Sequence, residues 1–363
     1  IRLSLVGSEM CIRDSILSDA RSPIHLETIN SLLNLGVEVW FEEDIGIGIN
    51  VSNSIFKELG LKKCSRDECL KNGDLLVTNQ ALDQGELELI KSNSTILGMV
   101  NPFNNQELIN SCSKLNINLV SMEFIPRITR AQKMDVLSSQ ANLAGYVSVI
   151  ESAKHLSIAL PMMMTAAGTL KPARVFVIGV GVAGLQGIAT AKRLGAQVWA
   201  YDVRAEVEEQ VLSLGGKFIK TSVSSHDGVY AKELSNKEEK ELQKELLSQL
   251  ERSNLIFTFA HVPGKKAPIL ITNKMMKNLK KDCLIIDTSA NSGGNCEGTV
   301  RNKVVNKNGI LIDGNTKILE LVKEDASKLY SENIRHFVEL LIEDENDEVI
   351  KGSKMYPKNK EGN

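Results

Sequence analysis

The stretch that decides the fold is Gly179-Val180-Gly181-Val182-Ala183-Gly184. It follows an apolar run that starts at Arg174, and it opens an Ala/Leu-rich segment that ends at Leu194. This pattern predicts a strand, a tight turn and the first turn of a helix. A second strand-like run, residues 197–201, leads into Asp202. Glycines followed by an acid about 20 residues later are typical of a dinucleotide-binding site.

Each residue type has a physical role in such a site. Gly179 permits the turn, Gly181 lets backbone N–H groups approach a pyrophosphate, and Gly184 lets the helix lie close to the strand. We expect Asp202 to accept hydrogen bonds from the hydroxyls of an adenosine ribose. Because its charge repels a 2′-phosphate, the sequence favours NAD(H) over NADP(H). We expect Val203 and Arg204 to contact the nucleotide as well. Because the Arg204 guanidinium could hold a 2′-phosphate, binding of NADP(H) stays open as an alternative.

The composition is that of a globular chain long enough for two domains, with 363 residues, 42% of them hydrophobic and 24% charged. The formal net charge is −2, so we expect no nucleic-acid partner. The longest apolar runs are far shorter than the ~20 residues that cross a bilayer. We therefore expect a soluble chain whose link to a membrane comes through a partner.

The six cysteines are scattered along the chain, and the one close pair, Cys64 and Cys69, has no second pair to complete a zinc site. The five histidines are equally dispersed. We therefore expect reduced thiols, a cytoplasmic protein and no bound metal.

Strand-like and helix-like runs alternate along the chain, which predicts parallel sheets covered by helices. We expect a first domain over residues 16–140, completed by a C-terminal helix within 325–355, and a second domain over 141–324. Residues 1–15 show no clear periodicity and need not be native, so we leave them unassigned. Residues 356–363 are rich in Lys, Asn and Gly, and we expect them to be disordered.

A second polar segment, residues 126–138, lies at the end of a predicted strand. It contains a cation, an amide and two oxygen-bearing groups: Arg127, Gln132, Asp135 and Ser138. Open α/β sheets bind ligands at the carboxyl ends of their strands, so this segment is a candidate site. The alternative is a surface loop that leads into a polar-faced helix.

Further motifs accompany these two segments: Met162-Met163-Met164-Thr165-Ala166-Ala167-Gly168, Pro263-Gly264-Lys265 and Gly293-Gly294-Asn295-Cys296. Taken together, they make the chain resemble the NAD(H)-binding component of proton-translocating NAD(P) transhydrogenase over about residues 21–323. The resemblance implies an α/β protein with two Rossmann-like, doubly wound parallel-sheet domains, a cleft between them, and a homodimer. We interpret the three methionines as core packing.

The resemblance also implies roles for individual residues. Arg127 holds the carboxamide or nearby phosphates of NAD(H), and Gln132 fixes the nicotinamide ribose. Asp135, with Ser138, orders the nicotinamide ring. Tyr230 is expected to close over the nucleotide as part of a mobile loop. The other residues expected to contact NAD(H) are Ile128, Thr129, Arg130, Lys133, Met134, Ala260 and His261.

The activity implied by the resemblance needs no protein acid or base. Hydride passes directly from NADH to NADP⁺ on a separate NADP(H)-binding subunit, and the chain's task is to bring the two rings into near-contact. In this family the transfer is coupled to proton movement through a membrane-spanning subunit. We therefore expect a component held on the cytoplasmic face of the inner membrane by its partners.

Two alternatives stay open. Alanine dehydrogenase shares the two-domain architecture, but it needs a lysine and a histidine in the first domain, and this chain has no histidine between His25 and His155. The strand-like run 75–79 also lacks a lysine. The second alternative is a non-catalytic NAD(H)-binding module.

The chain departs from the family pattern at Phe259 and His261, close to the expected position of the adenosine.

Overall fold

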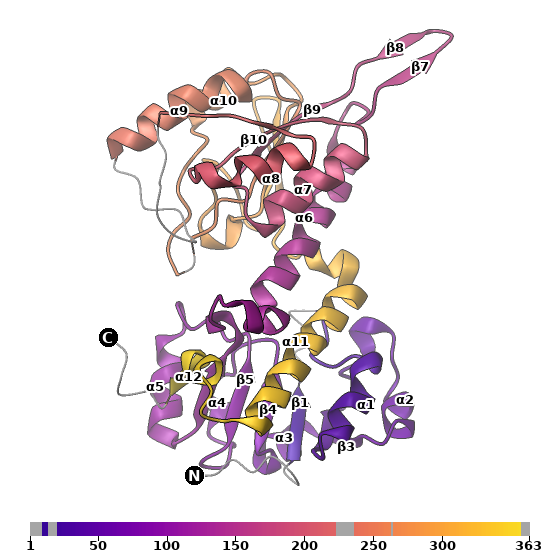
Figure 1. The fold of residues 1–363 in the computed structure, drawn as a ribbon, viewed down its shortest axis with the longest axis vertical. Helices are drawn as coiled ribbons and strands as arrows, with labels where there is room; N and C mark the ends of the chain where they lie inside the picture. Colours follow the sequence, from indigo (N-terminus) through magenta and orange to yellow (C-terminus); the bar gives the residue numbers. More distant parts are fainter. Residues whose placement is uncertain (1–8, 14–19, 223–235, 263, 357–363) are drawn as a thin grey trace. The chain divides into compact units, whose positions relative to one another are not determined.

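A computed structural model describes residues 9–13, 20–222, 236–262 and 264–356 (Figure 1). The chain divides into two compact units, residues 1–140 with 319–363 and residues 141–318. Each unit is built on one seven-stranded sheet, largely parallel, with helices around it. The predicted α/β class with two doubly wound sheets is confirmed. Within the described residues, no helix is both long enough and apolar enough to span a membrane.

In the first unit the strand order is β16-β6-β5-β4-β1-β2-β3, and neighbouring strands are parallel except β16 with β6. The order from β3 to β6 is doubly wound, and its direction reverses between β1 and β4. The strands are β1 (Glu9–Arg13), β2 (Glu38–Glu42), β3 (Lys62–Cys64), β4 (Leu75–Thr78), β5 (Thr95–Gly98), β6 (Asn118–Ser121) and β16 (Lys354–Tyr356).

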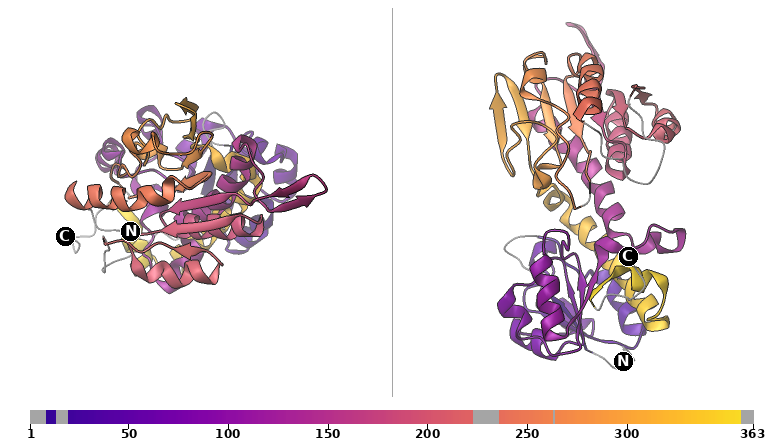
Figure 2. Two further views of the ribbon diagram at one scale, coloured as in Figure 1. Left: turned by 90° about the horizontal axis from the view of Figure 1, so that it is seen from above. Right: turned by 90° about the vertical axis from the view of Figure 1, so that its left-hand side faces the viewer.

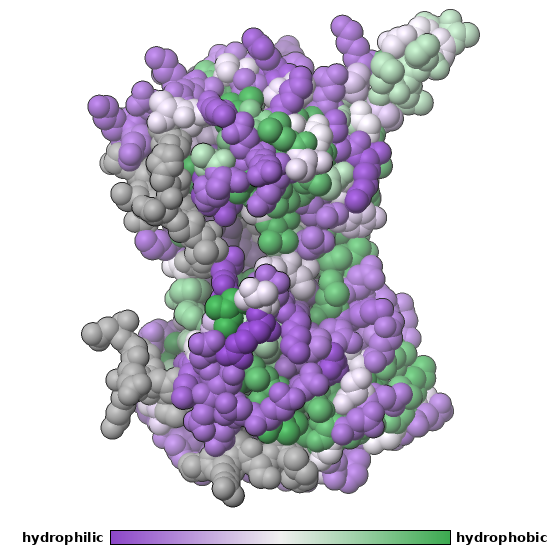
Figure 3. Space-filling model, viewed as in Figure 1, coloured by the Kyte–Doolittle hydropathy of each residue, from purple (hydrophilic) through white to green (hydrophobic). Residues whose placement is uncertain are grey.

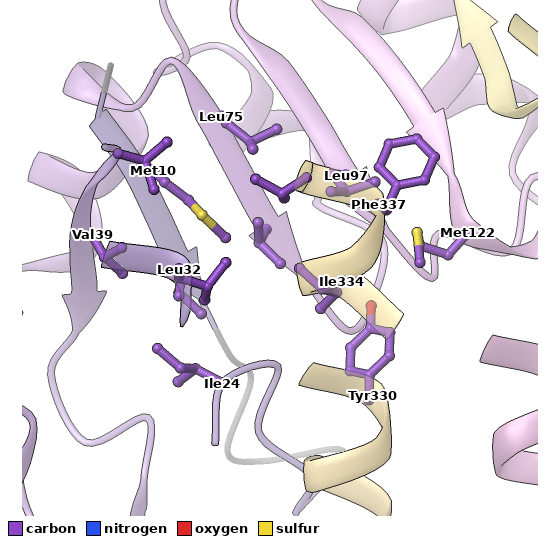
Figure 4. Close-up of a cluster of buried hydrophobic side chains, with 14 of the residues drawn as sticks. Met10, Ile24, Leu32, Val39, Leu75, Leu97, Met122, Tyr330, Ile334 and Phe337 are labelled. Atoms are coloured by element: carbon purple, nitrogen blue, oxygen red, sulfur yellow. The ribbon is translucent and has the colours of Figure 1, made fainter. Parts of the chain in front are cut away.

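Helices cover both faces of this sheet because successive strand residues point to opposite sides. Met10 of β1 belongs to the apolar cluster that α1 and α11 complete, whereas Cys11 belongs to the cluster of α3, α4 and α5. Figure 4 shows Ile334 and Phe337 of α11 within the first cluster. The helices are α1 (Leu26–Asn34), α2 (Asn53–Glu58), α3 (Arg66–Asn72), α4 (Gln84–Leu87), α5 (Gln106–Leu115), α11 (Lys323–Glu343) and α12 (Glu348–Ser353), with 3₁₀ turns η1 (Ile47–Ile49), η2 (Met122–Phe124), η3 (Thr129–Met134) and η6 (Ile318–Val322).

Two strands of this unit differ from the sequence predictions. Residues 9–13, which we left unassigned, form β1 in the centre of the sheet between β2 and β4. Tyr356, which we assigned to the disordered tail, is the last residue of β16. Both strands are short, and their pairing partners lie far away in sequence, so local periodicity does not predict them.

The cysteines also differ in part from the prediction. Cys64 and Cys69 are joined by a disulfide, with their Cα atoms 5.9 Å apart, so the prediction of six reduced thiols is wrong for this pair. The other four cysteines are free and buried. Burial raises the pKa of the Cys112 thiol to about 11 and those of Cys283 and Cys296 to about 12, so these thiols stay protonated and unreactive.

In the second unit the strand order is β11-β10-β9-β12-β13-β15-β14, and all neighbours are parallel except β14 with β15. The order reverses between β9 and β12, which defines the switch point where such sheets bind ligands. The strands are β9 (Arg174–Ile178), β10 (Gln197–Tyr201), β11 (Lys217–Phe218), β12 (Leu255–Thr258), β13 (Leu284–Asp287), β14 (Val304–Lys307) and β15 (Ile310–Asp313).

Alternate residues of β9 separate the two apolar layers of this unit. Val175 and Val177 pack with α6 and α7, whereas Phe176 and Ile178 pack with α9 and α10. Figure 2 shows helices on both faces of the sheet. They are α6 (Val136–His155), which begins in the first unit, α7 (Val182–Arg193), α8 (Glu208–Ser213), α9 (Asn236–Leu250) and α10 (Asn273–Met276), with 3₁₀ turns η4 (Ala205–Val207) and η5 (Ala290–Ser292).

The methionine run does not pack in the core. Met162, Met163 and Met164 are 60%, 46% and 76% exposed. They lie on a hairpin of β7 (Met163–Thr165) and β8 (Gly168–Leu170), which extends away from the second unit's sheet (Figures 1 and 3). The core interpretation is therefore wrong, because the hairpin projects as a two-stranded ribbon that no helix or sheet layer among the described residues covers.

Candidate nucleotide-binding site

The turn between β9 and α7 requires glycine at two positions for reasons of packing. Gly179 has φ +93°, and a Cβ there would lie 2.7 Å from the carbonyl carbon of Phe259, just beyond the end of β12. A Cβ on Gly184 would lie 2.1 Å from the carbonyl oxygen of Gly179. The turn therefore sits at the switch point, and the first turn of α7 lies directly against it.

Gly181 is different, because a Cβ there would meet no described heavy atom within 4 Å. It is the N-cap of α7, a helix of 12 residues, and it provides no side-chain cap. The first amides of a helix have no partner within the helix, and the helix dipole is positive at this end. Open space beside these donors fits the pyrophosphate of a dinucleotide.

Asp202 lies just past the end of β10 and is 8% exposed. Its Oδ2 accepts a hydrogen bond from the amide of Val180 at 2.7 Å, so the acid braces the glycine turn. Arg204 covers the same carboxylate, with Nε 2.9 Å from Oδ1 and Nη2 3.0 Å from Oδ2. This contact raises the pKa of the Arg204 guanidinium. The structure thus brings the predicted acid to the turn, and it pairs Arg204 with that acid.

The loop after β12 is tied to the loop after β13. The carbonyl of Ala260 accepts hydrogen bonds from Asn295 Nδ2 at 2.9 Å and from the Ser289 hydroxyl at 3.3 Å. His261 Nδ1 lies 3.3 Å from the Ser292 hydroxyl, and burial lowers the pKa of His261. These contacts hold residues 260 and 261 at the same sheet edge as the glycine turn.

Asp287 is a residue of this edge that the sequence analysis did not single out. It is 0% exposed, and its Oδ2 accepts from the amides of Asn295 and Cys296 and from the Thr299 hydroxyl at 2.6–3.0 Å. Its Oδ1 accepts from the Thr258 hydroxyl at 3.1 Å. Several donors offset the cost of burying this carboxylate. The signal in the sequence is an acid that ends an apolar strand shortly before Gly293 and Gly294.

In the first unit, residues 127–138 form η3 and the start of α6. Arg127 and Gln132 are exposed. Asp135 Oδ1 accepts from the amide of Ser138 at 3.0 Å, and Oδ2 accepts from the Ser138 hydroxyl at 2.6 Å. The predicted pair of Asp135 and Ser138 is therefore in direct contact, and it caps the first turn of α6.

Two other residues of this segment make contacts within the first unit. Met134 is 2% exposed and packs in the first unit's core, so only its backbone is available to a ligand. Arg130 binds Asp347 through both terminal nitrogens, at 2.7 and 3.0 Å, and lies 2.8 Å from Glu348. Both residues hold η3 in place.

The remaining predicted residues are placed as follows. Thr129 and Lys133 are exposed on η3, and Ile128 is half-buried. Val180 is buried, whereas Val182 is exposed at the start of α7. Ala183 and Val203 are partly exposed. Tyr230, the expected loop residue, and Pro263 lie outside the described residues.

A doubly wound sheet, a glycine turn at its switch point and an acid at the end of the next strand define a dinucleotide-binding α/β protein. Residues 12–144 match the family model "Alanine dehydrogenase/PNT, N-terminal domain", and residues 148–358 match "Alanine dehydrogenase/PNT, C-terminal domain". The chain therefore belongs to the alanine dehydrogenase/PNT family.

Three similar proteins within this family are transhydrogenases or their components. The first part of NAD(P) transhydrogenase subunit alpha of Rickettsia prowazekii is 38% identical over 92% of this chain and 90% of its own length. The corresponding protein of Rhodospirillum rubrum is 41% identical over 88% and 86%. The solved transhydrogenase of Sinorhizobium meliloti has a TM-score of 0.84 and 34% identity, covering 95% of this chain and 96% of its own. "Alanine dehydrogenase 1" of Staphylococcus aureus is 23% identical over 78% and 74%.

Proposed function

We propose that this chain is the NAD(H)-binding component of a proton-translocating NAD(P) transhydrogenase, in which hydride passes from NADH to NADP⁺ on a partner subunit. The observation that carries the proposal is the identity of 38–41% to transhydrogenase alpha subunits over most of the chain, against 23% to an alanine dehydrogenase. The names of those relatives as subunits support the existence of partner subunits.

The groups at the carboxyl end of β4 support the same choice. Asn79 donates to the Arg21 carbonyl at 2.9 Å, and the Thr78 hydroxyl donates to the Gln80 carbonyl at 2.9 Å. His25 is buried at the start of α1, where its ring lies 3.0 Å from Glu324. Amino-acid oxidation needs a positioned base, whose loss forfeits about 10²–10⁴-fold in rate. Hydride transfer between two nicotinamides needs no such group.

In the proposed complex the second unit holds the dinucleotide. The open space at Gly181 and the first amides of α7 receive the pyrophosphate, and Asp202 receives the adenosine ribose. Arg127, Gln132 and Ser138 of the first unit serve the nicotinamide end. Because the side chains of Met134 and Arg130 are engaged elsewhere, we assign them no contact with the nucleotide.

The quaternary proposal is a homodimer bound to an NADP(H)-binding subunit and to a membrane-spanning subunit that conducts protons. The exposed methionines of the β7–β8 hairpin support the dimer, because exposed clusters of apolar side chains mark interaction surfaces. The complex would sit on the cytoplasmic face of the inner membrane.

The test is a pair of assays on the same preparation. Mixed with NADH and the NADP⁺-loaded NADP(H)-binding subunit of a bacterial transhydrogenase, the chain should form NADPH. Given L-alanine and NAD⁺, it should form no NADH. Alanine-dependent NADH formation, without transhydrogenation, would overturn the proposal in favour of alanine dehydrogenase, and NADH binding with neither activity would favour a binding module.

A further inference from the structure

Asn333 is a polar side chain in a mainly apolar contact between α11 and η3. It is 6% exposed, and the buried η3 residues Ala131 and Met134 belong to the same apolar cluster as its helix neighbours Ile334 and Phe337. Burying an amide is unfavourable unless its donor and acceptor are both hydrogen-bonded. The presence of asparagine here is therefore explained by the bonds it makes.

The side-chain amide of Asn333 forms hydrogen bonds with the segment that carries Gln132 through both its nitrogen and its oxygen. Its Nδ2 donates to the backbone carbonyl of Lys133 at 2.8 Å, and its Oδ1 accepts from the Ser139 hydroxyl at 2.7 Å. Lys133 directly follows Gln132, and Ser139 lies in the first turn of α6. One side chain from α11 thus holds the segment on both sides of Asp135.

The position of Gln132 depends on this support because few contacts of its own side chain hold it in place. Its side chain is exposed, and within the described residues it makes no hydrogen bond. Its direction is therefore set by the backbone of η3, where the Gln132 carbonyl accepts from the Asp135 amide at 3.2 Å. The next carbonyl, that of Lys133, is the one that Asn333 binds.

We propose that Asn333 is a positioning residue for hydride transfer, which acts by holding the backbone next to Gln132. This inference rests on the proposed function, in which Gln132 serves the reacting end of NADH. A misplacement of about 1 Å at a reacting centre can lower a rate by about 10²-fold, so a group that touches no substrate can still control the rate.

Two substitutions separate the two bonds. Asn333→Asp keeps the acceptor for Ser139 but replaces the donor to the Lys133 carbonyl with a second oxygen. Ser139→Ala is the matched control, because it removes the bond to Asn333, together with the 3.1 Å contact of the same hydroxyl with the Val136 carbonyl, and leaves the Lys133 contact in place. Asn333→Leu removes both bonds and has no buried charge, so it provides a second variant if Asn333→Asp does not fold.

The full-length variants are compared in three measurements: single-turnover hydride transfer to an NADP⁺-loaded partner subunit, NADH affinity, and hydrogen exchange of the amides of residues 130–135. Asn333→Asp and Asn333→Leu should slow transfer at least tenfold, change NADH affinity by less than about threefold, and speed exchange. Ser139→Ala should stay within about threefold of the unmodified rate. Transfer at the unmodified rate by a folded Asn333 variant, or an equal loss in Ser139→Ala, would overturn the inference.

Failure of the inference is distinguishable from failure of the proposed function. If the unmodified chain transfers hydride and the Asn333 variants do so equally well, only the positioning role is wrong. If the unmodified chain transfers no hydride to any NADP(H)-binding subunit, the proposed function is wrong. The exchange measurement then still reports whether Asn333 orders η3.

Discussion

At the scale of single residues, Asp202 orders the glycine turn and is also the proposed acceptor for the ribose hydroxyls. Its carboxylate accepts from the Val180 amide and from Arg204, so it orders the glycine turn before any nucleotide arrives. A bound 2′-phosphate would require Arg204 to leave this carboxylate, and the phosphate would still face the negative charge. The pairing therefore strengthens the sequence-based preference for NAD(H) over NADP(H).

We predict that the isolated chain binds NADH at least tenfold more tightly than NADPH, a difference of about 1.4 kcal/mol. Calorimetric titration with both nucleotides measures this directly. Asp202→Ala should weaken NADH binding, because it removes the proposed acceptor for the ribose hydroxyls. Equal affinities for the two nucleotides in the unmodified chain would contradict the assignment of Asp202.

Gly181 and Gly184 allow a matched test of the phosphate site. Gly184→Ala should destabilise the fold by about 1–3 kcal/mol, since its Cβ would lie 2.1 Å from a backbone oxygen. Gly181→Ala should leave the melting temperature nearly unchanged, because its Cβ meets no described atom within 4 Å. It should nevertheless weaken NADH binding at least about tenfold, by about 1.4 kcal/mol. Unaltered affinity in Gly181→Ala would show that the pyrophosphate lies elsewhere.

At the scale of elements, the sequence predicts buried parallel strands well. The predicted bounds of β9 and β10 agree with the structure, because each is a short apolar run bounded by turn residues.

The sequence also predicts the part of the site that is local. The glycine turn between β9 and α7 and the position of Asp202 after β10 both follow from residues near one another in sequence. Asn333 could not be predicted in the same way, because its hydrogen-bond partners Lys133 and Ser139 lie 200 and 194 residues away in sequence. The contact of Arg130 with Asp347 could not be predicted for the same reason, since Asp347 lies 217 residues away.

A further prediction concerns Gln132 in the 3₁₀ turn η3. Gln132→Asn keeps the amide but shortens its reach by one methylene, so the nicotinamide end of NADH should be misplaced. We expect single-turnover hydride transfer to fall at least tenfold while NADH affinity changes only a few-fold. Stopped-flow absorbance and a binding titration provide the two values. If the variant transfers hydride at the unmodified rate, the assignment of this segment to the reacting end of the nucleotide is wrong.

At the scale of the whole molecule, the β7–β8 hairpin exposes apolar side chains to solvent. Met164 is 76% exposed, a large area of apolar surface to leave in water. We predict that Met164→Lys weakens self-association, as measured by sedimentation velocity, while NADH binding is retained. Val304→Lys is the control, because Val304 is another exposed apolar residue of the same unit, 45% exposed. An unmodified chain that sediments as a monomer, or equal effects of the two variants, would contradict a dimer built on the hairpin.

The central claim concerns the whole assembly: the chain holds NADH so that its hydride passes directly to NADP⁺ on another subunit. The most direct measurement uses NADH that carries deuterium at the transferable position of the dihydronicotinamide, mixed in ordinary water with the chain and an NADP⁺-loaded partner subunit. Mass spectrometry of the NADPH formed should find the deuterium retained, with no transfer when either protein is omitted. NADPH that carries hydrogen from water instead, or transfer by the chain alone, would contradict the account.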